Sequence, residues 1–252
     1  MNNTFDFGVV GLGVMGRNFI LNVAEKGFTA FGHDLDEAKV DSLINERGDN
    51  QDIGASANVK TFVDSLSLPR KIMLLVPAGK TVNIVIECLL PHLNPDDIII
   101  DGGNSFFRET DKREAYLKAK GIHFFGAGIS GGAKGARFGP SLMPGGSKDA
   151  YSLVQPIFEA VAAKFKGEPC VAYLGPKSAG NYVKMVHNGI EYALMQLISE
   201  TYNTLEVYGD YNNRELHELF IKWNQGRLQS FLMEITSKIL IKKDDQGDGY
   251  LV

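Results

Sequence analysis

The stretch FDFGVVGLGVMG, residues 5–16, runs from an apolar β-type segment directly into three glycines spaced as GxGxxG. Gly11 permits a tight turn, Gly13 lets a phosphate approach the backbone, and Gly16 lets the next helix pack closely on the strand. A segment of helical period follows, so a bound phosphate would lie at a helix N-terminus. We therefore predict a dinucleotide site in this turn. The residues expected to line it are Gly11, Leu12, Gly13, Val14, Met15 and Gly16.

Asp34 ends the second β-type segment, 18 residues after Gly16. A carboxylate at this position accepts hydrogen bonds from the adenosine ribose hydroxyls and repels a 2'-phosphate. Asp34 therefore favours NAD over NADP as the cofactor. Asp36 allows two interpretations, a second negative charge near the ribose or the N-cap of the helical segment that starts at Glu37.

The remaining pattern predicts the fold class, an α/β Rossmann-type fold with a doubly wound, mainly parallel sheet. Up to about residue 175, short β-type runs alternate with helical segments, as in a parallel sheet covered by helices. The expected strands are Phe5–Val10, Thr29–His33, Lys71–Val76, Asp97–Ile100, His123–Phe125 and Val171–Leu174. Three helical segments follow, at about 178–208, 213–223 and 228–241. We expect a dinucleotide-binding domain over residues 1–177 and the first helices of a second, all-helical domain over 178–252.

Composition excludes several classes of protein. With 30 acidic and 26 basic residues in 252, the net charge of -4 provides no positive field for nucleic acid. No apolar stretch reaches the ~18 residues of a membrane span, and the N-terminus does not resemble a signal peptide. Cys88 and Cys170 lack CxxC spacing, so no metal site is predicted. We expect a cytoplasmic protein that binds neither nucleic acid nor membranes.

Two further segments lie where a doubly wound sheet binds its ligands, at the carboxyl ends of strands. The run IIIDGGNS, residues 98–105, leads from a buried strand to two glycines and Asn104. Ser130, Gly131 and Gly132 follow the strand around Phe124 in the same way. Either segment alone also fits ordinary turn chemistry, but their joint occurrence favours a binding site.

The run KMVHNGIEY, residues 184–192, brings polar groups to one face of a predicted helix. At 3.6 residues per turn, this face carries Lys184, His187, Asn188, Glu191 and Tyr192. Residues 185–198 are mostly apolar, so the helix is expected to be buried nearly all round. Burial lowers the pKa of a lysine and raises that of a carboxyl, which suits a base and an acid. A structural ion pair is the alternative interpretation.

Four motifs together closely resemble 6-phosphogluconate dehydrogenase, the decarboxylating family of the pentose phosphate pathway. They are GLGVMG (11–16), IIDGGNS (99–105), GARFGPSLMPGG (135–146) and KMVHNGIEY (184–192). The first is shared by all β-hydroxyacid dehydrogenases, whereas the last two are specific to this family. The resemblance extends over the whole chain.

The resemblance implies oxidation of 6-phosphogluconate at C3, loss of CO2 and formation of ribulose 5-phosphate. Lys184 would be the base at the C3 hydroxyl and then the acid that assists decarboxylation, and Glu191 would protonate the enediol. The implied substrate-binding residues are Asn104, Ser130, Gly131, Gly132, His187, Asn188 and Tyr192. Beyond the glycine turn and Asp34, the implied cofactor-binding residues are Val76, Pro77, Ala78 and Asn104.

Two departures from the NADP-using pattern of the family point to NAD. The chain has Asp34, Leu35 and Asp36 where NADP-using members carry Asn-Arg-Thr, so the arginine that would hold the 2'-phosphate is absent. It also has Pro77 where they carry a lysine. NADP is therefore the less favoured cofactor.

The resemblance further implies that the chain is truncated at its C-terminus. The full-length form is expected to be a homodimer, and residues 178–252 the start of its substrate and dimerisation domain. We expect this chain by itself to be weakly active or inactive. Two other functions stay open from the sequence: a different β-hydroxyacid dehydrogenase, and a catalytically inert dinucleotide-binding fragment.

Overall fold

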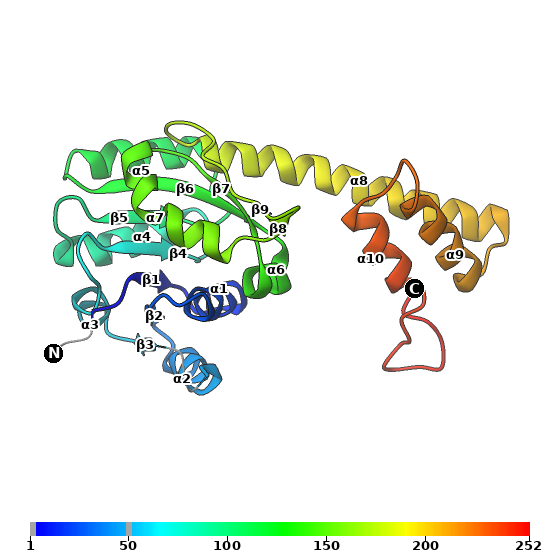
Figure 1. Cartoon of the computed structure of the whole chain (residues 1–252), viewed down its shortest axis with the longest axis horizontal. Helices are drawn as coiled ribbons and strands as arrows, with labels where there is room; N and C mark the ends of the chain where they lie inside the picture. The colour runs from blue at the N-terminus through cyan, green and yellow to red at the C-terminus, as the bar shows by residue number, and fades with distance from the viewer. Residues whose placement is uncertain (1–3, 49–51) are drawn as a thin grey trace. The chain divides into compact units, whose positions relative to one another are not determined.

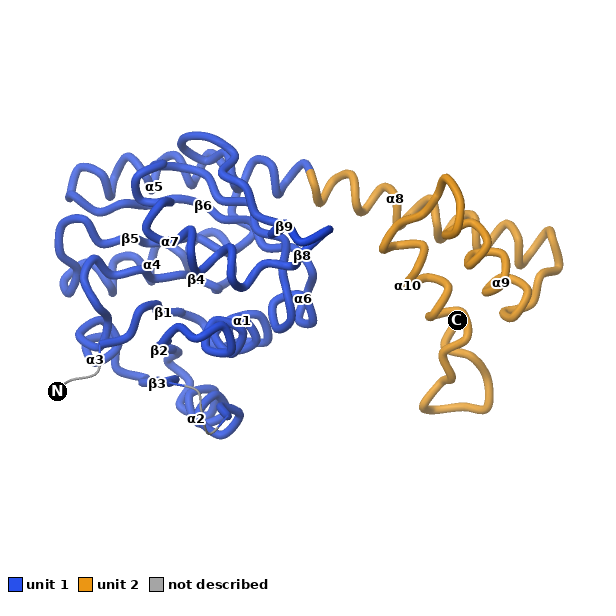
Figure 2. Tube along the Cα trace, in the orientation of Figure 1, with its two compact units in different colours: residues 1–186 blue, residues 187–252 orange. Residues whose placement is uncertain are grey.

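The computed structural model describes residues 4–48 and 52–252, and divides the chain into two compact units. Unit 1 covers residues 1–186 and unit 2 covers 187–252 (Figure 2). The division falls within helix α8 (Ala179–Gly209), so Lys184 belongs to unit 1 and His187 to unit 2. The expected domain boundary after residue 177 stays a prediction.

Unit 1 is built on a seven-stranded sheet in the order β3-β2-β1-β4-β5-β6-β7 (Figure 1). All neighbouring strands pair parallel except β6 and β7, which pair antiparallel. The strands are β1 (Phe7–Val10), β2 (Ala30–His33), β3 (Ile53–Ser56), β4 (Lys71–Leu74), β5 (Ile98–Asp101), β6 (His123–Ser130) and β7 (Ser141–Pro144). The order reverses at β1, which is where a doubly wound sheet binds its ligand.

Helices cover both faces of this sheet and bury two hydrophobic clusters. Successive strand residues belong to opposite clusters, as Ile98 and Ile99 show, because side chains alternate along a strand. One cluster packs against α1 (Val14–Glu25), α2 (Glu37–Glu46), α6 (Gly132–Phe138) and α7 (Lys148–Val161). The other packs against α3 (Val59–Asp64), α4 (Lys80–Leu89) and α5 (Phe107–Lys118). A short 3-10 helix (Leu90–His92) and a hairpin of β8 (Lys164–Phe165) and β9 (Glu168–Pro169) complete the unit.

Unit 2 contains the rest of α8, α9 (Asn213–Asn224) and α10 (Phe231–Ile239). Its small core consists of Leu216, Phe220, Met233 and Leu240. Asn212 and Glu215 form a reciprocal capping box at the start of α9. Across residues 4–48 and 52–252, none of the helices is both long enough and apolar enough to cross a membrane.

The structure confirms the Rossmann-type fold class, and it corrects one predicted strand. Residues 171–174 do not form a strand, since only Val171 makes an isolated bridge to Leu142 of β7. The strand β7 itself was not predicted, nor was β3. The three predicted helices after residue 178 correspond to α8, α9 and α10, the last of which begins at Phe231 rather than 228.

Candidate functional site

The glycine turn connects β1 to α1 and leaves open space at the helix N-terminus. Gly11 has φ +95°, and a Cβ there would lie 2.4 Å from the Leu75 carbonyl oxygen. A Cβ on Gly16 would lie 1.8 Å from the Gly11 carbonyl oxygen, so only glycine lets α1 pack this closely on the turn. Gly13 is the N-cap of α1, and a Cβ there would meet no atom within 4 Å. This cradle fits a dinucleotide pyrophosphate, whose negative charge the helix N-terminus stabilises.

These glycines should respond differently to alanine. Gly16→Ala is expected to lower the free energy of unfolding by about 1–3 kcal/mol or more, because the methyl group overlaps backbone. Gly13→Ala should lower the free energy of unfolding by less than Gly16→Ala does, because its only structural cost is a poorer N-cap. It should weaken NAD+ binding at least about tenfold, because its methyl group takes phosphate space. Urea denaturation and calorimetric titration measure the two effects. Gly249→Ala, also without a close neighbour, is the control, and unchanged NAD+ affinity in Gly13→Ala would contradict the cradle.

Asp34 follows β2 and is held by the glycine turn. Its carboxylate accepts hydrogen bonds from the backbone N–H of Leu12 at 2.8 Å and of Asp36 at 3.0 Å, and lies 3.3 Å from the ammonium of Lys39. Partial burial acts to raise the pKa of Asp34, but these two backbone donors and Lys39 outweigh it and the pKa is lowered. The stabilisation from the ionised form is therefore present above the ordinary value of 3.8 and is lost as the pH falls below it. Asp34 is anionic at neutral pH.

The neighbours of Asp34 take separate roles. The Asp36 carboxylate accepts a hydrogen bond from the Ala38 N–H at 3.0 Å, so it is the N-cap of α2. Leu35 is 85% exposed and supports no core contact. Lys39 was not singled out in the sequence, although its position five residues after Asp34, in the first turns of α2, could have indicated the pair.

The other predicted cofactor residues follow β4 and β5. Val76 is half-buried, and Pro77 and Ala78 are exposed, in the segment between β4 and α4. Asn104 is exposed in the segment between β5 and α5. Because β4 and β5 are parallel neighbours, both segments leave the same edge of the sheet.

Ser130, Gly131 and Gly132 lie at the junction of β6 and α6. Ser130 is the last residue of β6, Gly131 is the N-cap of α6, and Gly132 is its first residue. Gly131 has φ +125°, and its Cβ would lie 2.8 Å from Gly135, so the turn requires glycine. A Cβ on Gly132 would meet nothing within 4 Å. The junction therefore presents a hydroxyl and a helix N-terminus at the carboxyl end of β6.

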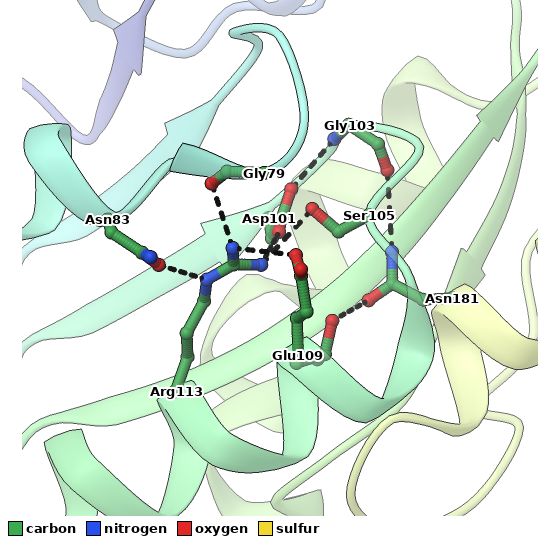
Figure 3. A network of polar contacts seen from close by, with 9 residues as sticks. Gly79, Asn83, Asp101, Gly103, Ser105, Glu109, Arg113 and Asn181 are labelled. Carbon is green, nitrogen blue, oxygen red and sulfur yellow. Dashed lines mark hydrogen bonds and ion pairs between the residues drawn. The ribbon is translucent and has the colours of Figure 1, made fainter. Parts of the chain in front are cut away.

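Lys184 is buried against β6, with only 7% of its surface exposed. A Cβ on Gly128 would lie 2.4 Å from the Lys184 Cβ, so the lysine stem crosses the strand where a side chain is absent. One turn earlier in α8, Asn181 fills the equivalent space over Gly126. Asn181 accepts a hydrogen bond from Thr110 at 2.9 Å and donates one to the Gly103 carbonyl at 3.4 Å (Figure 3). These contacts fix the start of α8 on the sheet edge that carries Asn104.

The remaining predicted residues belong to unit 2. The His187 Nδ1 atom lies 3.5 Å from the Glu191 carboxylate and 3.4 Å from the Asn188 amide oxygen. Tyr192 is 69% exposed. The expectation that α8 is buried nearly all round is wrong for the described residues, because in unit 2 apolar residues such as Ile190 and Leu197 are exposed.

Arg113 and Asp101 were not singled out from the sequence, although both are buried beside the Asn104 segment. Asp101 ends an apolar strand, a signal that could have been used, whereas nothing local distinguishes Arg113. In the part of the chain that the structure describes, no group of three or more His, Cys, Asp or Glu side chains could hold a metal ion.

Comparison with protein families gives two matches that together cover most of the chain. Residues 6–175 match the NAD binding domain of 6-phosphogluconate dehydrogenase, and residues 180–252 match the C-terminal domain of 6-phosphogluconate dehydrogenase. The glycine turn, Asp34 and the β6–α6 junction all lie in the first range. That range is an NAD(P)-binding domain.

Curated relatives support the same assignment. The NADP(+)-dependent, decarboxylating 6-phosphogluconate dehydrogenase of Bacillus subtilis is 49% identical over 97% of this chain, and one from Saccharomyces cerevisiae is 49% identical over 97%. The chain spans about half the length of these relatives, 52% and 50% respectively.

Solved structures agree in fold. The Plasmodium falciparum 6-phosphogluconate dehydrogenase, studied in its apo form and with NADP+ or 6-phosphogluconate, is 44% identical with a TM-score of 0.92, over 98% of this chain and 53% of that one. A Mycobacterium tuberculosis 3-hydroxyisobutyrate dehydrogenase reaches a TM-score of 0.73 over 90% of this chain and 72% of its own, at 19% identity, which shows a shared fold alone. On the family match over residues 6–175, the chain belongs to the 6-phosphogluconate dehydrogenase family.

Proposed function

We propose that the chain carries the dinucleotide site and the acid–base residues for oxidative decarboxylation of 6-phosphogluconate to ribulose 5-phosphate. The observation that carries this proposal is the burial of Lys184 against Gly128, two residues before Ser130 of the β6–α6 junction. A lysine held there packs on the strand that ends at Ser130, one of the groups proposed to bind the sugar acid. The names of the relatives support this substrate.

In the proposed reaction, Lys184 takes the proton of the C3 hydroxyl. The C3 hydride would pass to a bound nicotinamide, which is the chemistry that the cofactor supplies, and a 3-keto acid would remain. The bond between C1 and C2 then breaks, C1 leaves as CO2, and its electron pair forms the enediol while Lys184 returns its proton to the C3 oxygen. Glu191 protonates the enediol carbon that becomes C1 of ribulose 5-phosphate, and the hydroxyl on the former C3 gives its proton back to Lys184 as the ketone forms.

Binding of the sugar acid is assigned to the residues that the family resemblance implies. They are Asn104, Ser130, Gly131, Gly132, His187, Asn188 and Tyr192. The amide, hydroxyl and imidazole groups of this set can hydrogen-bond to the substrate's hydroxyls and carboxylate. The hydrogen-bonding distances among His187, Asn188 and Glu191 support a shared polar cluster in unit 2.

We propose NAD as the preferred cofactor, with NADP as the alternative. The named Bacillus subtilis relative is NADP(+)-dependent, so family membership by itself favours NADP. The support for NAD comes from this chain's own residues, because the ionised Asp34 carboxylate would face a 2'-phosphate and no arginine stands at position 35. A cytoplasmic location and a full-length homodimer stay predictions.

Glu191→Gln should slow the reaction at its last proton transfer. Turnover is expected to fall by about 10- to 100-fold, while NAD+ affinity stays within twofold, because an amide cannot supply the proton. Deuterium incorporation at C1 of ribulose 5-phosphate, followed by NMR in D2O, isolates this step. Glu200→Gln, an exposed glutamate in the same helix, is the control. If Glu191→Gln incorporated deuterium at C1 as fast as wild type, the proton transfer would belong to another group.

A further inference from the structure

Arg113 in α5 connects two chain segments that each follow a strand of the sheet (Figure 3). On one side its guanidinium donates to the Gly79 carbonyl at 2.9 Å and to the Asn83 amide oxygen at 2.7 Å. On the other side its Nη1 atom donates to the Ser105 hydroxyl at 3.4 Å and lies 3.7 Å from the Asp101 carboxylate. One side chain therefore holds both the β4–α4 segment and the β5–α5 segment.

The Arg113 cation faces two carboxylates, of which Asp101 is buried and Glu109 is 43% exposed. The side chain of Arg113 is only 6% exposed, and the Asp101 side chain is more completely buried. Burial raises the pKa of Asp101, although hydrogen bonds from the Ser105 hydroxyl and the Gly103 N–H and the charge of Arg113 oppose this shift. Glu109 adds a second carboxylate 3.0 Å from Nη2. The cation therefore has compensating charge on two sides, which keeps it in place.

The geometry requires a guanidinium. Arginine presents five N–H donors in a rigid plane, and here they point to acceptors in α4, in the segment after β5 and in α5 itself. A lysine ammonium is a single point with three donors and cannot reach all of these acceptors at once. The arginine fork therefore links the two segments beyond the ends of the paired strands β4 and β5.

Both segments lie on the side of β1 opposite to Asp34. The sheet order places β2, which Asp34 follows, on one side of β1, and β4 and β5 on the other. A dinucleotide crosses a doubly wound sheet at this reversal, with one nucleotide half on each side. If Asp34 binds the adenosine ribose, the nicotinamide half lies over the ends of β4 and β5, where Val76 and Asn104 are found.

We propose that Arg113 is a positioning residue for the nicotinamide half of the dinucleotide site. By holding residues 76–79 and 102–105 at a fixed separation, it shapes the surface that receives the nicotinamide and its ribose. The inference rests on the proposed dinucleotide function and assigns to Arg113 no contact with the substrate or cofactor.

The test compares a whole dinucleotide with its adenosine half. Calorimetric titrations with NAD+ and with ADP, and with NADP+ and 2',5'-ADP as the phosphorylated pair, would be run on wild type, Arg113→Met and Arg113→Lys. Both variants are expected to bind the dinucleotides at least tenfold more weakly and the half-molecules within twofold of wild type. Arg108→Met, an exposed arginine of the same helix, should leave all four affinities unchanged.

Three results would overturn the inference. The first is unchanged dinucleotide affinity in Arg113→Met, and the second is an equal loss of affinity for the half-molecules. The third is wild-type dinucleotide affinity in Arg113→Lys, which would show that only the positive charge is needed. If circular dichroism shows that Arg113→Met does not fold, Asn83→Ala decides the matter, because Asn83 is exposed and loses a single contact. If Asn83→Ala binds the dinucleotides two- to fivefold more weakly and the half-molecules as wild type does, the inference is supported. Unchanged affinity for the dinucleotides refutes it.

The same titrations separate this inference from the proposed function. Wild-type protein that binds neither NAD+ nor NADP+ would refute the proposed function itself. Wild-type binding that Arg113→Met leaves unaltered would refute only the positioning role.

Discussion

Lys184→Met is expected to abolish reduction of the dinucleotide by 6-phosphogluconate while leaving dinucleotide affinity within twofold of wild type. The methionine stem keeps the packing over Gly128, so the start of α8 should stay in place. What is lost is the group proposed to remove the C3 proton, and general base catalysis contributes about 100-fold or more. The rate of dinucleotide reduction is measured by absorbance at 340 nm in a single turnover, with protein in excess over 6-phosphogluconate. Calorimetric titration measures the dinucleotide affinity.

Lys118→Met is the matched control, because Lys118 is an exposed lysine in the last turn of α5. It should react at the wild-type rate. If Lys184→Met kept more than a few per cent of the wild-type rate, Lys184 would not be the base. If it lost dinucleotide affinity as well, its role would be structural.

The second large effect concerns the choice of cofactor. Wild type is expected to bind NAD+ at least tenfold more tightly than NADP+, equivalent to about 1.4 kcal/mol. Replacing Asp34, Leu35 and Asp36 by Asn, Arg and Thr should shift the ratio of the two dissociation constants by about 100-fold toward NADP+. The triple variant removes two carboxylates and adds a guanidinium that can pair with the 2'-phosphate.

The surrounding structure should tolerate these changes. An asparagine at 34 can still accept the Leu12 hydrogen bond, Leu35 is exposed, and threonine at 36 can still cap α2. Lys39→Met, tested in the wild-type background, shows whether the ammonium beside Asp34 contributes to NADP+ binding. Comparable wild-type affinities for NAD+ and NADP+ would contradict the proposed preference and favour the cofactor named for the Bacillus subtilis relative.

The elements predicted well from the sequence are those fixed by local chemistry. The glycine turn was predicted because glycine is required at individual positions of the turn. A Cβ at Gly11 or Gly16 would overlap a backbone oxygen. The predicted start of α9 at residue 213 is also correct, and it depends on local sequence, since Asn212 and Glu215 form a cap within four residues of chain.

The elements that failed depend on partners distant in the sequence. Residues 171–174 have the composition of a strand, but the place beside β6 is taken by β7, which pairs antiparallel. The apolar content of α8 predicted burial, whereas Ile190 and Leu197 are exposed, because burial depends on packing partners that composition does not specify. Arg113 gained its partners only because β4 and β5 are neighbours in the sheet.

The most direct test of the account measures reduced dinucleotide and CO2 together. Protein in excess would be incubated for hours with 6-phosphogluconate labelled at C1 and with NAD+ or NADP+, beside Lys184→Met and with 3-hydroxyisobutyrate as a second substrate. We expect slow formation of one labelled CO2 per reduced dinucleotide, abolished in Lys184→Met. Reduction without CO2, or faster reduction with 3-hydroxyisobutyrate, would contradict it in favour of another β-hydroxyacid dehydrogenase. Dinucleotide binding with no reduction at all would indicate an inert fragment.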